Sequence, residues 1–172
     1  MEFLKVLTNP WYESLKQPAE TQQRVLQELL SEYKKTKHGI EHGADEMQNP
    51  EDYRKRMPII SYKSLQPQLS DVIAGNYQTL LPEPPLTWVM TRGSTGKAKV
   101  LPATKTHLEQ IFSCGARAYI NYALRKNDTE VLTGKVLNLN FPSTVHAMNL
   151  NGQPITYGYS SGTYARLNPM LN

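Results

Sequence analysis

One short stretch decides how this chain is expected to fold: Thr91-Arg92-Gly93-Ser94-Thr95-Gly96-Lys97-Ala98-Lys99. Its two glycines permit backbone angles that other residues resist, and they let a ligand approach the main chain closely. The hydroxyl residues between them add hydrogen-bond donors, and Lys99 adds a positive charge on a flexible stem. Backbone N–H groups in such a loop can converge on an anion, so the stretch predicts a phosphate-binding loop. Composition alone fits a solvated turn equally well, because turns are rich in the same residues.

The spacing within the stretch excludes the P-loop pattern. A P-loop places four residues between its first glycine and a Gly-Lys pair, and a serine or threonine follows the lysine. Here only Ser94 and Thr95 separate the two glycines. Ala98 also occupies the place of the hydroxyl residue that would bind magnesium.

The residues on both sides of the loop predict regular structure. Prolines at positions 82, 84 and 85 deliver an extended chain into the apolar residues 86–90, which are expected to form a strand that feeds the loop. Residues 100–101 are expected to return as a short strand. Residues 134–141 alternate apolar and polar side chains and predict a half-buried strand. Strand, loop, long helix and strand in this order are typical of an α/β fold with sheet and helix layers.

The helix that follows the loop is the best-defined element in the sequence. Apolar residues recur at helical spacing from Leu108 to Ala123, and Thr106 and Glu109 form a capping-box pattern at its start. Gly115 lies inside this helix at a cost of about 1 kcal/mol relative to alanine, which predicts close packing against a neighbour. Cys114 is the sole cysteine, which excludes an internal disulfide, and it is expected to be a small buried residue.

Residues 1–76 are expected to be mostly helical. Apolar side chains from Val25 to Tyr33 fall on one helical stripe, and Gly39 is expected to end that helix. Asn49 and Pro50 are typical of an N-cap followed by proline at the first helical position. Residues 64–74 predict a further short helix that ends at Gly75.

One segment in this region, residues 38–42, has the His-x-x-Glu-His order of an inverted zinc-protease motif. That chemistry requires a helix that continues through both histidines. Gly39 and Gly43 bracket the segment and are expected to terminate the helix. The sequence therefore predicts a loop with two exposed histidines and no metal site.

Composition sets broad limits on function. The chain of 172 residues fits one domain, and its 39% of apolar residues predicts either a modest core or part of a larger unit. The net charge of +4 suits an anionic ligand, whereas the basic clusters at residues 34–37 and 54–56 are too short to predict a nucleic-acid partner. No signal peptide or membrane-spanning run is visible, so a cytoplasmic location without a membrane partner is expected.

The loop resembles the phosphate-loop motif of the acyl-adenylate-forming superfamily, which reads two hydroxyl residues, Gly, two hydroxyl residues, Gly, any residue, Pro and Lys. The match holds at Thr91, Gly93, Ser94, Thr95, Gly96 and Lys99. It departs at Arg92, which replaces a hydroxyl residue, and at Ala98, which replaces proline. The flanking residues 22–43, 57–62 and 154–166 resemble the auxin-responsive acyl-acid amido synthetases, of whose larger catalytic domain the chain represents the first part.

This resemblance implies the N-terminal part of an adenylate-forming domain, with N-terminal helices packed on a mixed sheet and residues 1–172 forming a single partial domain. It implies ATP and Mg²⁺ as cofactors, with a carboxylic acid and an amine or amino acid as substrates. Lys99 is implied as the catalytic residue, and the six matching loop residues are implied to hold the phosphates. Ser160, Ser161 and Tyr164 are implied to contact the acid. Arg117 is a further candidate partner for the acid's carboxylate, against the alternative of a solvated arginine.

Several parts of the family's machinery are not found in the sequence. These are the aromatic–glycine–acid motif that grips the adenine, the ribose-binding aspartate and the mobile C-terminal domain with its lysine. The chain is therefore expected to be inactive alone and to need the remainder of its own polypeptide as a partner. The alternative hypothesis is a non-catalytic α/β domain that binds an anion or a partner protein.

Overall fold

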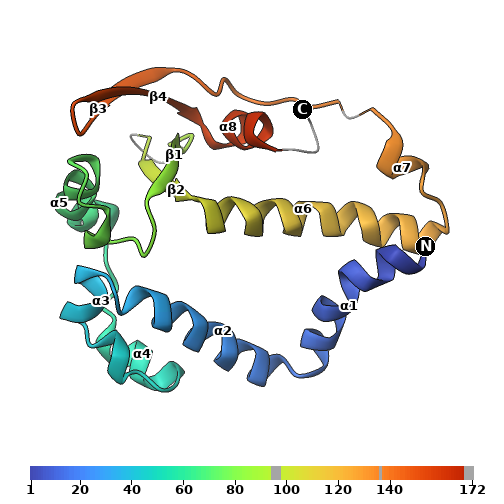
Figure 1. Cartoon of the computed structure of the whole chain (residues 1–172), viewed down its shortest axis with the longest axis horizontal. Helices are drawn as coiled ribbons and strands as arrows, with labels where there is room; N and C mark the ends of the chain where they lie inside the picture. Colours follow the sequence, from blue (N-terminus) through green and yellow to red (C-terminus); the bar gives the residue numbers. More distant parts are fainter. Residues whose placement is uncertain (94–97, 136, 169–172) are drawn as a thin grey trace.

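The computed structural model describes residues 1–93, 98–135 and 137–168 of the chain (Figure 1). Its helices are α1 (Glu2–Lys16), α2 (Pro18–Tyr33), α3 (Lys37–Glu41), α4 (Pro50–Arg56), α5 (Tyr62–Ile73), α6 (Lys105–Lys126), α7 (Glu130–Thr133) and α8 (Ser160–Leu167), with 3₁₀ turns η1 (Ala44–Glu46) and η2 (Tyr77–Thr79). Its strands are β1 (Pro85–Met90), β2 (Val100–Thr104), β3 (His146–Leu150) and β4 (Gln153–Tyr159).

The four strands form one mixed sheet in the order β2-β1-β4-β3. β1 pairs with β2 and β3 pairs with β4 in antiparallel fashion. The two hairpins join through β1 and β4, which run parallel and pair Val89 with Gly158 and Met90 with Tyr159. The expected α/β class, the mixed sheet and the strands on both sides of the glycine loop are therefore confirmed.

Helices α5, α6 and α8 contact this sheet. α8 continues from the end of β4 and lies beside the first half of α6 (Figure 1), where His107 Nε2 of α6 and the Tyr164 hydroxyl of α8 are 3.1 Å apart. α5 borders the sheet, since the backbone N–H of Asn151 donates to the carbonyl of Ile73 at 3.1 Å. α1 instead packs against the far half of α6, where the Tyr12 hydroxyl donates to Asn121 Oδ1 at 2.9 Å.

A small apolar core holds α2 to the segment that follows it. Leu30 of α2 is buried with Ala44 and Met47, and Leu26 and Met57 pack against them. The rest of the apolar stripe on α2 is not covered, because Val25 and Leu29 are exposed. No helix among the described residues is both long enough and apolar enough to cross a bilayer.

Side-chain caps explain where several helices begin. The Asn49 side chain accepts hydrogen bonds from the N–H groups of Glu51 and Asp52 at the start of α4, as expected. α6 begins at Lys105, so the expectation that Thr106 caps it is wrong by two residues. Its N-cap is Thr104, whose hydroxyl accepts from the His107 N–H at 3.2 Å.

A tertiary contact adds to this cap. A carboxylate oxygen of Glu83, 23 residues upstream, accepts the Thr106 N–H at 2.9 Å. Hydrogen bonds from Thr106 hold the pKa of Glu83 below its usual range. Glu83 therefore satisfies a free N–H of the first turn and places a negative charge at the positive end of α6.

Residues 134–141 do not form the expected strand. Their described part, which omits residue 136, is irregular, and Leu137 and Leu139 are 87% and 88% exposed. An alternating pattern is half-buried only beside another strand, and both sides of β4 are already paired with β1 and β3. Residues 134–141 therefore find no free strand edge at the centre of the sheet.

Three expectations about single residues are also wrong. Cys114 is exposed, and a side chain at Gly115 would meet no atom within 4 Å. Cys114 and Gly115 lie on an exposed face of α6, whose buried residues, Leu108 and Ala123, lie near its two ends. Gly39 lies inside α3 and does not end α2, which ends at Tyr33. A Cβ at Gly39 would lie 2.0 Å from the carbonyl oxygen of Tyr33, so the position has room only for glycine.

We predict that Glu83→Ala lowers the free energy of unfolding by about 0.5–2 kcal/mol at neutral pH, the usual range for loss of a helix cap. Because the pKa of Glu83 is lowered in the folded chain, its contribution is present above the unfolded value near 4.5 and is lost as the pH falls through the folded pKa. Urea unfolding at several pH values measures both effects.

The matched control is Glu109→Ala on the same helix, where the exposed ion pair with Lys105 spans 3.6 Å and contributes little. An equal loss of stability in both variants, or a Glu83→Ala effect that does not shrink as the pH falls below 4.5, would contradict this role of Glu83.

Candidate functional site

The candidate site lies at the edge of the sheet where the two parallel strands end together. Met90 of β1 is paired with Tyr159 of β4, so both strands reach this edge at the same level. β1 continues into the glycine loop and β4 continues directly into α8. Ligands of open sheets bind outside the carboxyl ends of parallel strands, where such loops and helix ends converge.

Thr91 closes the glycine loop at its base. The backbone N–H of Thr91 donates to the carbonyl of Lys99 at 2.9 Å, and the Lys99 N–H donates to the Thr91 hydroxyl at 3.1 Å. Gly93 has φ +67°, a left-handed conformation that favours glycine. Ser94, Thr95 and Gly96 lie outside the described residues, as does Lys97. The described ends of the loop are thus held together by the first and last residues of the motif.

Tyr62, the first residue of α5, reaches the same loop from a distant part of the chain. Its hydroxyl accepts the N–H of Val100 at 3.1 Å and lies 3.2 Å from the carbonyl oxygen of the same residue. The ammonium of Lys99 lies 5.7 Å from the centroid of the Tyr62 ring. No spacing in the sequence indicates this contact, which joins residues 38 positions apart.

Arg92 connects the loop to the start of α8. Its guanidinium lies 4.1 Å from the ring centroid of Phe141, whose ring is 5.1 Å from that of Tyr159. The Phe141 N–H donates to the hydroxyl of Ser161 at 3.3 Å. Arg92, one of the two residues that depart from the superfamily motif, is thus held on an aromatic pair beside the first turn of α8.

The residues expected to contact the acid come from α8. Ser160 and Ser161 are its first two residues, and the N-cap residue, Tyr159, makes no side-chain cap hydrogen bond. Tyr164 lies one turn further along and contacts His107. Burial raises the pKa of Tyr164, so its hydroxyl keeps its proton at neutral pH. The structure thus brings Ser160 and Ser161 to the edge of the sheet where the glycine loop begins.

Arg117 is not brought together with these residues. It lies ten residues beyond His107 on α6, which is about 15 Å along a helix axis. Its guanidinium lies 5.2 Å from the ring centroid of Trp11 on α1, and one of its nitrogens is 3.4 Å from Cys114 Sγ. In this arrangement Arg117 serves the contact between α1 and α6.

Two glycines allow residues 141–143 to lie directly against β4 and α8. A Cβ at Gly158 would lie 2.3 Å from the carbonyl carbon of Ser143, and a Cβ at Gly162 would lie 1.9 Å from the carbonyl oxygen of Phe141. The Tyr159 N–H donates to the carbonyl of Pro142 at 3.0 Å in the same contact. Small residues are therefore required here for the aromatic pair to reach the loop.

The His-x-x-Glu-His segment differs from its expected form. It lies largely in α3, and His38 and His42 are both half-buried, with ring centroids 4.3 Å apart. Burial, followed by the neighbouring His42, lowers the pKa of His38. Among the described residues no group of three or more His, Cys, Asp or Glu side chains is placed to hold a metal ion.

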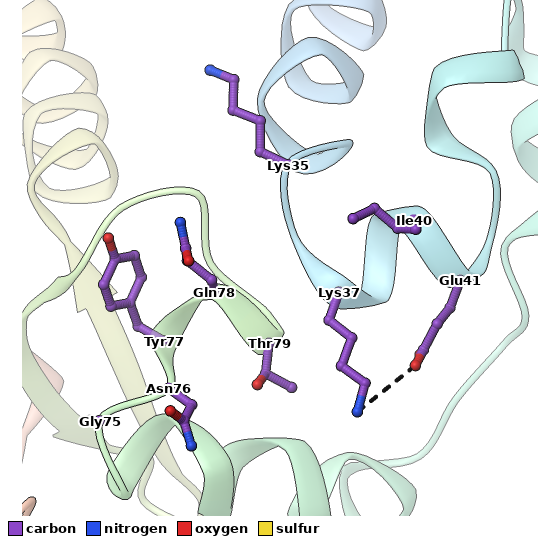
Figure 2. A pocket seen from close by; sticks show the side chains of 9 residues that line it. All are labelled: Lys35, Lys37, Ile40, Glu41, Gly75, Asn76, Tyr77, Gln78 and Thr79. Carbon is purple, nitrogen blue, oxygen red and sulfur yellow. Dashed lines mark ion pairs between the residues drawn. The ribbon is translucent and has the colours of Figure 1, made fainter.

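A pocket of about 450 Å³ lies elsewhere, between α3 and the segment around η2 (Figure 2). It is lined by Lys35, Lys37, Ile40, Glu41, Gly75, Asn76, Tyr77, Gln78 and Thr79. None of the residues singled out from the glycine loop or α8 lines it. Both of its lysines lie near glutamates, at 2.7 Å for Lys35 and Glu32 and 3.9 Å for Lys37 and Glu41. The edge of the sheet therefore remains the candidate site.

Comparison with known proteins defines the class. Residues 9–170 match the model of the GH3 family N-terminal domain, and the chain therefore belongs to the GH3 family.

Curated relatives cover about half of the chain at low identity. The indole-3-acetic acid-amido synthetase GH3.6 of Arabidopsis thaliana is 26% identical over 93 residues, which are 53% of this chain and 15% of that protein. The probable indole-3-acetic acid-amido synthetase GH3.2 of Oryza sativa subsp. japonica is 24% identical over 91 residues, 52% of this chain and 15% of that protein. The synthetase GH3.17 of Arabidopsis thaliana is 28% identical over 94 residues, with shares of 52% and 15%. No solved structure gives a significant match.

We predict opposite effects of alanine at two helical glycines. Gly162→Ala destabilises the chain by about 1–3 kcal/mol, because the new methyl group meets backbone that cannot move without breaking the α8 contact. Gly115→Ala stabilises it by about 0.5–1 kcal/mol, because the helix gains propensity and the space is open.

Thermal and urea unfolding of both variants measures these effects. A neutral Gly162→Ala would contradict the close approach of Phe141 to α8, and a destabilising Gly115→Ala would contradict the open space beside the middle of α6.

Proposed function

We propose that this chain carries the phosphate-binding part of an ATP-dependent acyl-acid amido synthetase. The observation that supports this most directly is the closed loop between Thr91 and Lys99 at the end of β1, beside the start of α8. The family assignment supports the same proposal, and so do the names of the relatives, which are indole-3-acetic acid-amido synthetases. The substrates we propose are a carboxylic acid and an amine or amino acid.

The donors at the loop fit a polyphosphate. The Lys99 side chain is exposed and pairs with no carboxylate among the described residues, so its charge is free to meet an anion. The left-handed Gly93 lets a phosphate group approach the main chain. Mg²⁺ would enter with the nucleotide, and we assign none of its ligands to this chain.

Bound ATP would supply the chemistry of activation, in which a carboxylate oxygen bonds to the α-phosphorus and pyrophosphate leaves. This chain would contribute position and charge to that step. Lys99 and the loop N–H groups would hold the β- and γ-phosphates and stabilise the charge that accumulates on the leaving group. Ser160, Ser161 and Tyr164 would hold the acid at the neighbouring edge of α8. Conjugation to the amine would require further groups.

We also propose that the N-terminal helices pack against the remainder of an adenylate-forming domain. On α1, Phe3 and Val6 are 72% and 65% exposed, and Leu15 on the same helix is exposed as well. On α2, Val25 and Leu29 are exposed too. In this proposal the remainder of the domain covers these exposed apolar side chains on both helices. In this proposal the chain by itself does not complete the reaction.

We predict that Lys99→Ala weakens binding of Mg·ATP to the chain by about tenfold or more, since a charge-assisted contact contributes about 1.5–3 kcal/mol. The matched control is Lys126→Ala at the far end of α6, which leaves the dissociation constant unchanged. Isothermal titration calorimetry with ATP and with AMP measures the effect, and AMP distinguishes β- and γ-phosphate contacts from adenosine contacts. If the unmodified chain gives no binding heat, or if Lys99→Ala binds Mg·ATP with the same affinity as the unmodified chain, the proposed loop function is wrong.

A further inference from the structure

The hydroxyl of Tyr62 forms hydrogen bonds with backbone groups on the open edge of the sheet. β2 is an edge strand, and its residue Val100 lies opposite Met90 of β1. The neighbouring pair, Thr91 and Lys99, exchanges the hydrogen bond between the strands. In an antiparallel ladder hydrogen-bonded and non-hydrogen-bonded pairs alternate, so the N–H and carbonyl of Val100 point away from β1. The Tyr62 hydroxyl contacts both of these groups, at 3.1 and 3.2 Å.

The position of Tyr62 is itself fixed by the start of α5. Ser61 is the N-cap, and its hydroxyl accepts the N–H of Ser64 at 3.1 Å. The Ser64 hydroxyl in turn accepts the N–H of Ser61 at 3.0 Å, which completes a reciprocal capping box. Tyr62 follows the cap directly, so a rigid helix end presents its side chain to β2.

Lys99 is consequently held on both sides. Its own N–H and carbonyl bond to Thr91, and both polar groups of the next residue, Val100, contact Tyr62. The backbone of residues 99–100 thus has all four polar groups engaged. The side chain is oriented as well, because the ammonium lies 5.7 Å from the Tyr62 ring centroid, within the range of a cation–π contact.

We propose that Tyr62 is a positioning residue for Lys99. Its hydroxyl fixes the main chain where residues 99–100 enter β2, and its ring holds the Lys99 ammonium near the start of α5. This inference rests on the proposed function, in which Lys99 binds the nucleotide phosphates. Tyr62 does not belong to the phosphate-loop motif and would act on the nucleotide only through Lys99.

Two substitutions separate the parts of this role. Tyr62→Phe keeps the ring and removes the hydroxyl, so amide hydrogen exchange at Val100 becomes faster while exchange at the buried Ala103 does not change. Tyr62→Leu removes both, and the dissociation constant for Mg·ATP rises about three- to tenfold. Tyr53→Phe on α4 is the control, because this exposed tyrosine leaves both measurements unchanged.

A double-mutant cycle with Lys99→Ala distinguishes positioning from a general structural effect. If Tyr62 acts through Lys99, Tyr62→Leu weakens ATP binding in the unmodified chain and has no further effect in the Lys99→Ala variant. Equal weakening in both backgrounds, or no weakening in either, would overturn the inference.

A nucleotide-free measurement keeps the inference separate from the proposed function. The ring of Tyr62 shifts the NMR signals of the Lys99 ε-protons, and this shift disappears in Tyr62→Leu but not in Tyr62→Phe. If the unmodified chain binds no ATP, the proposed function fails, and the ring-current shift still decides whether Tyr62 orients Lys99. If the chain binds ATP but the shift is absent, the positioning role fails alone.

Discussion

The parallel pairing of β1 with β4 is the contact on which the rest of the structure depends. It joins two antiparallel hairpins by pairing residues 69 positions apart in the chain, Val89 with Gly158 and Met90 with Tyr159, and it aligns the glycine loop with the first turn of α8. The pairing involves Gly158, where residues 142–143 cross so closely that a side chain would collide with their backbone. The site is therefore built where backbone packs against backbone.

Elements whose signals are local could be predicted from the sequence. β1 follows a run of prolines and β2 follows the loop, and the apolar repeat from Leu108 to Ala123 falls inside α6. Asn49 caps α4 as expected, because a side chain that bonds N–H groups two and three residues later needs no distant partner. The expected strand at residues 134–141 failed for the opposite reason. Its alternation matches a strand, but partners elsewhere in the chain decide whether a strand forms there.

The residues of the candidate site also divide into those that a local motif indicates and those that only distant contacts place. The loop motif located Thr91, Gly93 and Lys99, and the resemblance of the C-terminal segment located Ser160 and Ser161, which the fold places at the same edge. Tyr62, Glu83 and Phe141 could not be found in this way. Each acts through a contact with a residue at least 20 positions away, and none belongs to a motif with fixed spacing. Arg117 was singled out by resemblance alone, and the fold places it against Trp11.

The closed base of the glycine loop has a consequence for the free energy of ligand capture. A free segment that orders around an anion loses about 1–2 kcal/mol of conformational entropy for every residue it fixes. Here the two ends of the loop are already tied, by Thr91 to Lys99 and by Tyr62 to Val100, before any ligand arrives. Folding of the sheet has thus already restricted the described ends of the loop, so in the proposed function these residues lose no further conformational entropy when an anion binds.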